Sequence, residues 1–325
     1  MTNSFDLTWE LDGITMEGTV VCPAGEGPFP AVVLVAGSGP TDRDWCSPLV
    51  PGSNGSARLL AEAFTEAGIA SLRYDKRASG PHAMENAGKL IGKISMQSHL
   101  DELVAAVTML SQQDCVDSSR ISGLGHSEGT LHVLHYATTP QDVPFAGIIL
   151  AGPPGRPIQD VLLSQLALQA AQNLGGAELM ARVEKAAARY AAGQPMDPDP
   201  SLPQSIKMIL AGFEAPVNLP FVRELWSESA TDSLAKVQVP VLVLIGAKDV
   251  QVDMHADGTP LQEAAAGMTD VTFSFPANAN HVFKGDLRTP AEVATSPGSG
   301  FNEAGTRLDP ASLETILSWL SRAGA

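Results

Sequence analysis

Short apolar runs alternate with amphipathic helical patterns along the first half of this chain. Residues 31–35 form an uninterrupted apolar run that ends before Gly37, which is typical of a strand buried on both faces of a parallel sheet. Residues 57–67 then place apolar side chains at helical spacing and are followed by Gly68, a residue type that commonly ends helices. Because this alternation continues to residue 150, the sequence predicts βαβ units and an α/β fold with a mostly parallel sheet.

The other expected elements follow the same reasoning. Alternating apolar and polar residues on both sides of Asp12-Gly13 predict a β-hairpin over residues 5–22. We expect further strands at residues 69–74, 120–124, 145–150, 240–245 and 271–275, and helices at residues 97–110, 128–137 and 312–323.

No good strand pattern is found between residues 151 and 239. Helical patterns are found there instead, at residues 161–171, 177–192 and 205–213. We therefore predict that residues 1–154 and 236–325 form one α/β core, and that residues 155–235 form a helical cap inserted into it.

The charge of the chain limits its partners. It has 36 acidic and 20 basic residues, and its formal net charge is −16. Nucleic acids and anionic membranes both require basic surfaces, so we expect neither as a partner. The N-terminus lacks a secretory signal pattern, and no apolar run reaches the roughly 18 residues of a membrane span. These observations predict a cytoplasmic protein that acts on a small molecule; the oligomeric state is left open.

Cys22, Cys46 and Cys115 are few and odd in number, without a C-x-x-C spacing. We expect three reduced, buried thiols, no metal site and no cofactor.

The motif with the clearest chemistry is Gly125-His126-Ser127-Glu128-Gly129, between an expected strand and an expected helix. G-x-S-x-G in this context forms a tight turn in which Ser127 adopts strained backbone angles, and flanking glycines remove clashing side chains. The Ser127 side chain then lies exposed at the carboxyl end of the sheet. At this helix N-terminus the backbone N–H of Glu128 can face an oxyanion.

A nucleophilic serine needs a histidine base and an acid. Asp249 follows the strand at residues 240–245, and His281 follows the strand at residues 271–275. The carboxyl ends of parallel strands lie at one edge of a sheet, where ligands bind, so the sequence predicts Ser127, Asp249 and His281 as a catalytic triad.

Other acids and histidines lie nearby in the sequence. Asp253 and Asp257 lie further into the loop, and His255 lies only six residues after Asp249, with no strand between them. We therefore favour Asp249 as the acid and His281 as the base.

The loop at residues 36–44 follows the first buried strand and is rich in small residues. Its backbone N–H groups can approach a substrate oxygen, and Ser38 is our first choice for the second oxyanion donor, with Gly39 as the second. The alternative is a plain glycine-rich turn. A phosphate loop is excluded because no G-K-[ST] follows.

Two charge clusters, residues 42–44 and 75–77, follow neighbouring strands. They could bind a charged substrate, or they could pair with one another and stiffen the oxyanion loop. In the expected cap, Met208, Phe213 and Phe221 could line an acyl pocket or be ordinary packing residues. Trp45, beside the oxyanion loop, is the tryptophan that could touch a substrate.

These residues together resemble the α/β-hydrolase superfamily, in its serine carboxylesterase and dienelactone-hydrolase-like branch. The resemblance covers residues 30–154 and 236–325. It rests on the loop at residues 36–44, on Arg73-Tyr-Asp-Lys-Arg77, on the elbow at residues 125–129, on Gly246-Ala-Lys-Asp249 and on Asn280-His-Val-Phe283.

The resemblance implies Ser127 as nucleophile, Asp249 as acid, His281 as base, and an oxyanion hole at Ser38 and Glu128. Two departures are visible. Dienelactone hydrolases use a cysteine nucleophile, and the chain reads Arg77-Ala-Ser-Gly80 where similar esterases read Arg-Gly-x-Gly.

The sequence therefore predicts a serine hydrolase that cleaves carboxylic esters through an acyl-enzyme. The alternatives are an acyl-peptidase or amidase, a thioesterase, and a non-catalytic binding protein on the same fold.

Overall fold

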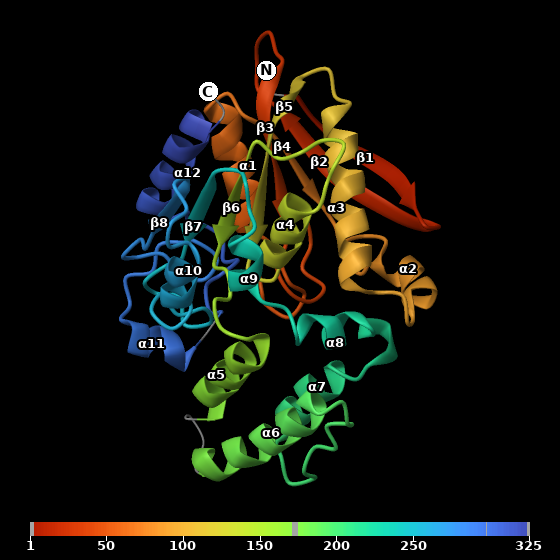
Figure 1. Ribbon diagram of the computed structural model, residues 1–325, viewed down its shortest axis with the longest axis vertical. Coiled ribbons are helices and arrows are strands. Elements are labelled where there is room, and N and C mark those ends of the chain that lie inside the picture. The colour runs from red at the N-terminus through yellow and green to blue at the C-terminus, as the bar shows by residue number, and fades with distance from the viewer. Residues whose placement is uncertain (1–2, 171–174, 297, 324–325) are drawn as a thin grey trace.

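One eight-stranded sheet forms the centre of the molecule, with the strand order β1-β2-β4-β3-β5-β6-β7-β8 (Figure 1). The structure is a computed structural model and describes residues 3–170, 175–296 and 298–323. The strands are β1 (Asn3–Leu11), β2 (Ile14–Cys22), β3 (Phe29–Val35), β4 (Ala70–Tyr74), β5 (Val116–His126), β6 (Gly147–Ala151), β7 (Val241–Leu244) and β8 (Val271–Ser274).

Strands β3 to β8 pair in parallel, whereas β1 and β2 pair antiparallel with each other and β2 pairs antiparallel with β4. The expected hairpin is confirmed. Asp12 and Gly13 join its strands with φ angles of 54° and 73°, and positive φ at both central residues is what a type I′ hairpin turn requires.

Helices cover both faces of the sheet. They are α1 (Ser56–Glu66), α2 (Ala83–Leu90), α3 (Met96–Ser111), α4 (Gly129–Thr138), α5 (Ile158–Ala170), α6 (Gly176–Ala191), α7 (Gln204–Gly212), α8 (Phe221–Leu225), α9 (Ala230–Leu234), α10 (Gly258–Ala264), α11 (Pro290–Thr295) and α12 (Pro310–Ala323), with the 3-10 helix η1 (Pro216–Asn218).

The apolar run in β3 shows why both faces need helices. Successive side chains of a strand point to opposite faces. Val32 and Leu34 pack in a cluster with apolar residues of α1 and α12, while Val33 and Val35 pack in a second cluster with residues of α3 and α4. A strand buried on both faces has no polar face, so the continuous apolar run and the doubly covered parallel sheet have the same cause.

In its described part, the segment between β6 and β7 consists of helices joined by loops, and α5 to α8 lie beyond one end of the sheet, below the strands in Figure 1. Leu166, Val183, Tyr190 and Leu210 belong to a small apolar cluster of its own. By contrast, apolar residues of the 221–234 segment join the main core. Apolar side chains at residues 221–234 therefore already pack in the main core, although we had predicted that the cap extends to residue 235.

The long strands and helices predicted from the sequence are confirmed to within a few residues; the last residue of the helix predicted at 161–171 lies outside the described residues. Strand β5 begins earlier than predicted. We missed its first half because that half is partly exposed and polar and contains no apolar run. We missed α2, α8, α9, α10 and α11, which have five to eight residues each. So few residues give little helical periodicity.

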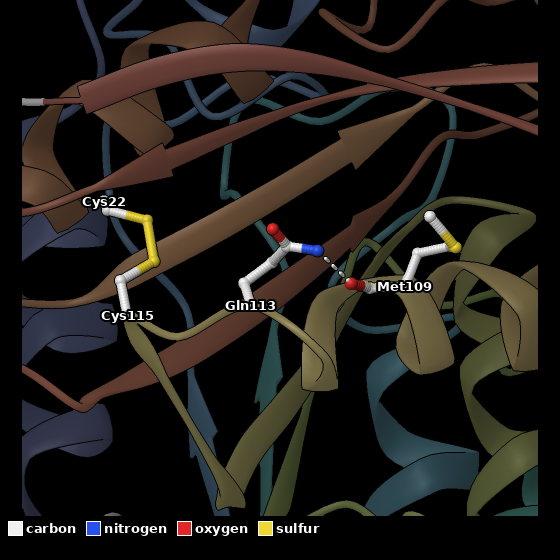
Figure 2. Close-up of a disulfide and its surroundings, with 4 residues drawn as sticks. All are labelled: Cys22, Met109, Gln113 and Cys115. Atoms are coloured by element: carbon white, nitrogen blue, oxygen red, sulfur yellow. Dashed lines mark hydrogen bonds between the residues drawn. A yellow bond between two sulfur atoms is a disulfide. The ribbon is translucent and has the colours of Figure 1, made fainter.

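The expectation of three reduced thiols is wrong, because Cys22 and Cys115 form a disulfide with a Cα–Cα distance of 6.3 Å (Figure 2). Cys22 ends β2, which runs antiparallel to β4, and Cys115 directly precedes β5. Both cysteines therefore lie at the edge of the sheet where the parallel strands begin. They are 93 residues apart in sequence, so only the folded sheet and its loops bring them together.

Beside the disulfide, the Gln113 side chain donates a hydrogen bond to the carbonyl of Met109, in the last turn of α3, at 2.7 Å (Figure 2). Cys46 is free and buried.

No helix within the described ranges is long and apolar enough to cross a membrane. The cytoplasmic location stays a prediction. The disulfide argues against that location, because disulfide bonds are rare in reducing compartments.

We predict that Cys22→Ser lowers the free energy of unfolding by about 2–5 kcal/mol, because a bond that closes a loop of this length restricts the unfolded chain. Denaturant unfolding with and without reductant measures the change. The variant Cys46→Ala keeps the disulfide and should respond to reductant as the wild type does.

Thiol titration in denaturant gives an independent readout. It should find only the Cys46 thiol before reduction, and all three cysteines after it. Three reactive thiols before reduction would contradict the disulfide.

Candidate active site

Ser127 lies in a sharp turn between β5 and α4. Its φ of 53° is in the left-handed region, which costs an ordinary side chain roughly 1–2 kcal/mol. The turn is held by its backbone, since Ser127 N–H donates to the Ala151 carbonyl at 2.8 Å and Thr130 N–H donates to the Ser127 carbonyl at 3.0 Å. Strain that the surroundings hold in place is common at functional sites.

The flanking glycines are needed because the backbone crosses itself closely here. A Cβ on Gly125 would lie 2.4 Å from the Gly129 carbonyl oxygen, and a Cβ on Gly129 would lie 2.6 Å from the carbonyl oxygens of Val35 and Ala36. Both distances are too short for any side chain. The G-x-S-x-G pattern thus reflects steric exclusion at both positions.

Asp249 and His281 are brought together as an ion pair or hydrogen-bonded pair. His281 Nδ1 lies 2.7 Å from Asp249 Oδ2, and both residues are buried. The other carboxylate oxygen, Oδ1, accepts hydrogen bonds from the N–H groups of Gln251 and Val252 at 2.8 and 3.0 Å. The loop backbone therefore fixes the carboxylate, and the carboxylate in turn orients the imidazole.

Ser127 is linked to this pair through its neighbour His126. His126 Nε2 donates to the His281 carbonyl at 2.9 Å, and the two rings lie 4.8 Å apart between centroids. Within the described residues, no hydrogen bond joins the Ser127 hydroxyl to the His281 ring. Such contacts often shorten only when substrate binds.

The alternative acids have other partners. Asp257 is fully buried and holds Arg156 through both carboxylate oxygens, with Nη2 to Oδ2 at 2.8 Å. Asp253 accepts from the N–H groups of His255 and Ala256 at 2.9 and 2.7 Å. His255 itself is exposed.

The amides of Ser38 and Glu128 lie on the same cavity as Ser127. Neither N–H donates a hydrogen bond to any part of the chain that the structure describes. A Cβ on Gly37 would lie 3.1 Å from Ser127 Cβ, so the loop that carries Ser38 runs directly beside the serine side chain. Gly39, our second choice, also lines the cavity and has a φ of 72°.

The two charge clusters pair with each other, as the second of our alternatives stated. Arg43 donates from its backbone N–H and from Nε to the two oxygens of Asp75, both at 2.7 Å. Arg73 pairs with Asp44. These bonds join the loop after β3 to β4 and to the loop that follows it.

Lys76 is a member of these clusters whose role the sequence did not indicate. It is buried, its Nζ donates to the Gly37 carbonyl at 2.5 Å, and it lies 3.6 Å from Glu128 Oε1. Burial alone would raise the pKa of Glu128, but the Lys76 ammonium, with His132 on the other side, draws that pKa below its ordinary value.

Further buried polar side chains follow Glu128 in a series of contacts that leads away from Ser127. His132 Nε2 lies 3.5 Å from Glu128 Oε1, and its ring packs on His99 at 4.5 Å. His99 contacts Glu102 at 3.1 Å, and Glu102 also binds Arg77. The pKa of Glu102 falls to about 2, because His99 and Arg77 outweigh the effect of burial.

A cavity of about 690 Å³ opens between Ser127 and the helical insert. Phe213 and Phe221 line it, as the sequence suggested, together with Leu90 of α2. Met208 is 66% exposed and lies outside the lining. It points to solvent because α7 buries Ile206 and Leu210 instead.

Trp45 also lies outside the cavity lining. It is buried with a φ of 65° and stacks on the His126 ring at 4.7 Å. Its indole therefore supports the residue before the serine and does not face the cavity.

The part of the cavity wall formed by α2 was missed, because that helix was not predicted. Across the described ranges, no group of three or more histidine, cysteine or acidic side chains is arranged to hold a metal ion.

Comparison with known proteins decides the family. The model of a family described as "Alpha/beta hydrolase family" matches residues 32–295. The chain belongs to that family. The match spans the parallel strands on both sides of the helical insert, and it confirms the resemblance drawn from the motifs.

Among relatives of this alpha/beta hydrolase, esterase EstD of Thermotoga maritima is 32% identical over 151 residues, which cover 46% of this chain and 33% of EstD. The match therefore spans about a third of that protein. An uncharacterized 31.7 kDa protein of Escherichia coli is 29% identical over 217 residues, 65% of this chain and 72% of that protein.

Two solved structures show the shared fold. An esterase of Pyrococcus furiosus superposes with a TM-score of 0.56 at 16% identity, covering 100% of this chain and 92% of that one. A dienelactone hydrolase from Anabaena variabilis gives 0.53 at 14% identity, covering 99% and 98%.

The buried histidines predict how acid affects stability. Burial, with the neighbouring His99, lowers the pKa of His132 from 6.5 to about 4. Below pH 6.5 the unfolded chain binds a proton at this ring that the folded chain does not bind until about pH 4. The folded state is therefore destabilised as pH falls through this window, by up to about 3 kcal/mol.

We predict that His132→Leu, of similar volume, removes this part of the acid sensitivity. Free energies of unfolding measured at pH 7 and pH 4 should differ by up to about 3 kcal/mol less in the variant than in the wild type. Parallel stability curves for the two proteins would contradict the prediction.

Proposed function

We propose that this alpha/beta hydrolase cleaves carboxylic esters with Ser127 as nucleophile, His281 as base and Asp249 as acid. The observation that carries the proposal is that Ser127 lies on a strained turn at the wall of an apolar cavity. The ring of the preceding residue, His126, donates to the His281 carbonyl, and His281 forms a buried pair with Asp249. A non-catalytic binding protein has no need of this strain or of a buried acid–base pair.

The reaction follows from the chemistry of these groups. Asp249 holds the proton of His281 on Nδ1, which leaves Nε2 free to take the proton of the Ser127 hydroxyl as its oxygen attacks the ester carbonyl. The N–H groups of Ser38 and Glu128 stabilise the oxyanion. The imidazolium then gives its proton to the leaving alcohol, and water cleaves the acyl-enzyme with the same base.

The cavity favours an ester with an apolar acyl or alcohol group. Its wall is mainly aliphatic and aromatic, and the charged side chains on it, Lys76 and Glu128, face each other as a pair. With a chain charge of −16, this leaves little attraction for the phosphates of an acyl-CoA thioester. The relatives named as esterases add support for ester chemistry.

We predict that Ser127→Ala abolishes hydrolysis of p-nitrophenyl esters and labelling by a fluorophosphonate probe, since both require the hydroxyl. Esterase assays and mass spectrometry of the labelled protein test this. Ser119→Ala, which changes an exposed serine of the same strand, is the matched control and should keep both activities.

Wild-type activity in Ser127→Ala would overturn the nucleophile. An unlabelled, inactive wild type would favour a binding protein. Faster turnover of matched amides or thioesters than of esters would favour the alternative reactions.

The cavity wall predicts selectivity for chain length. Phe213→Ala removes an aromatic ring from the wall, so we expect the preferred p-nitrophenyl ester in a series from acetate to decanoate to shift toward longer chains. Met208→Ala, on the helix that Phe213 caps but outside the wall, should keep the wild-type profile. A shift caused by Met208→Ala, or none caused by Phe213→Ala, would contradict this view of the pocket.

A further inference from the structure

We propose that Lys76 is a positioning residue for both oxyanion donors, a role that rests on the proposed function. Its ammonium donates to the carbonyl of Gly37, which belongs to the same peptide unit as the N–H of Ser38. It also lies beside the carboxylate of Glu128, the residue that supplies the other N–H.

The first contact acts through a single peptide unit. The Gly37 carbonyl and the Ser38 N–H belong to the same trans peptide, and they point in opposite directions within its plane. Lys76 Nζ donates to that carbonyl at 2.5 Å. The lysine therefore fixes the rotation of this peptide and directs the Ser38 N–H away from itself.

The same contact strengthens the donor. A charge-assisted hydrogen bond to a carbonyl oxygen is about twice as strong as a neutral one. Electron density drawn toward the oxygen leaves the N–H of the same amide more positive, because linked hydrogen bonds polarise one another. Lys76 is only 5% exposed, so water screens this effect little.

The second contact involves the other donor. Glu128 Oε1 lies 3.6 Å from Lys76 Nζ, and both side chains are buried. A buried ammonium requires such a partner. As a result, one lysine restrains the loop after β3 and the first residue after the nucleophile at the same time.

The position of Gly37 makes this restraint relevant to catalysis. Its Cα is so near the serine that an added Cβ would lie 3.1 Å from Ser127 Cβ. A small rotation of the 37–38 peptide would therefore move the Ser38 N–H relative to the reacting carbonyl. The negative charge develops only in the transition state, so loss of Lys76 should lower kcat more than it changes KM.

The test compares a p-nitrophenyl ester with its thiono analogue, in which sulfur replaces the carbonyl oxygen. Backbone N–H groups bind a compact oxyanion better than a thiolate, so the ratio of kcat/KM for the two substrates reports on the oxyanion hole. We expect Lys76→Met to lower kcat for the ester by about 10–100-fold, less than the loss of a whole donor. KM should change by less than about 3-fold, and the ester-to-thionoester ratio should fall by about 10-fold.

Lys76→Met alone leaves Glu128 buried without its ammonium and could unfold the protein. The double variant Lys76→Met/Glu128→Gln removes both charges, keeps the backbone N–H, and should show the same fall in the ratio. The matched control is Arg77→Met/Glu102→Gln, which neutralises the neighbouring buried pair. It should lower the melting temperature and keep the ratio.

An unchanged ratio in the folded Lys76 variants, with an active wild type, would overturn the role of Lys76 and leave the proposed function standing. An equal fall in the Arg77 control would assign the effect to general loosening and also overturn it. A wild type that neither cleaves esters nor reacts at Ser127 would overturn both proposals.

Discussion

The parallel register of the central sheet is the constraint on which the site depends. Hydrogen bonds align Val35 with Gly125, and His126, Ala151, Leu244 and Ser274 form one continuous row across β5 to β8. All these strands therefore end at the same level. The segments that continue from them carry Ser38, Ser127, Gly152, Asp249 and His281. A residue that follows one strand thus meets residues that follow its neighbours, however far apart they lie in sequence.

Close backbone approach at this edge has two consequences. It leaves no room for a side chain at Gly125 and Gly129, and an added Cβ at Gly37 would be in tight contact with Ser127 and His126. It also buries charged and imidazole side chains, which contact one another in a continuous series of six residues: Lys76, Glu128, His132, His99, Glu102 and Arg77. An unpaired ion here would cost several kcal/mol. The electrostatics below the cavity and the shape of the elbow therefore arise from the same dense packing.

Local patterns explain how far the sequence could be interpreted. The buried strand at residues 31–35, the Asp12-Gly13 turn and the G-x-S-x-G elbow each depend on neighbours within a few residues, so their sequences specify them. Asp249 and His281 could be assigned to one edge because each follows a strand, and the structure brings them within 2.7 Å of each other. No local pattern indicated whether the side chains of Met208 and Trp45 face the cavity, because their orientation depends on packing between elements that are distant in sequence.

The sequence by itself determined the strand and helix pattern, the turn that strains Ser127, and the edge of the sheet where Asp249 and His281 lie. It did so because period, chain order and glycine positions are local properties. The tertiary structure alone decided that Cys22 pairs with Cys115, that α2 completes the cavity wall, and that Lys76 binds the Gly37 carbonyl. Each of these contacts joins segments that lie apart in sequence, and only the packing of the whole sheet with its helices and loops brings them together.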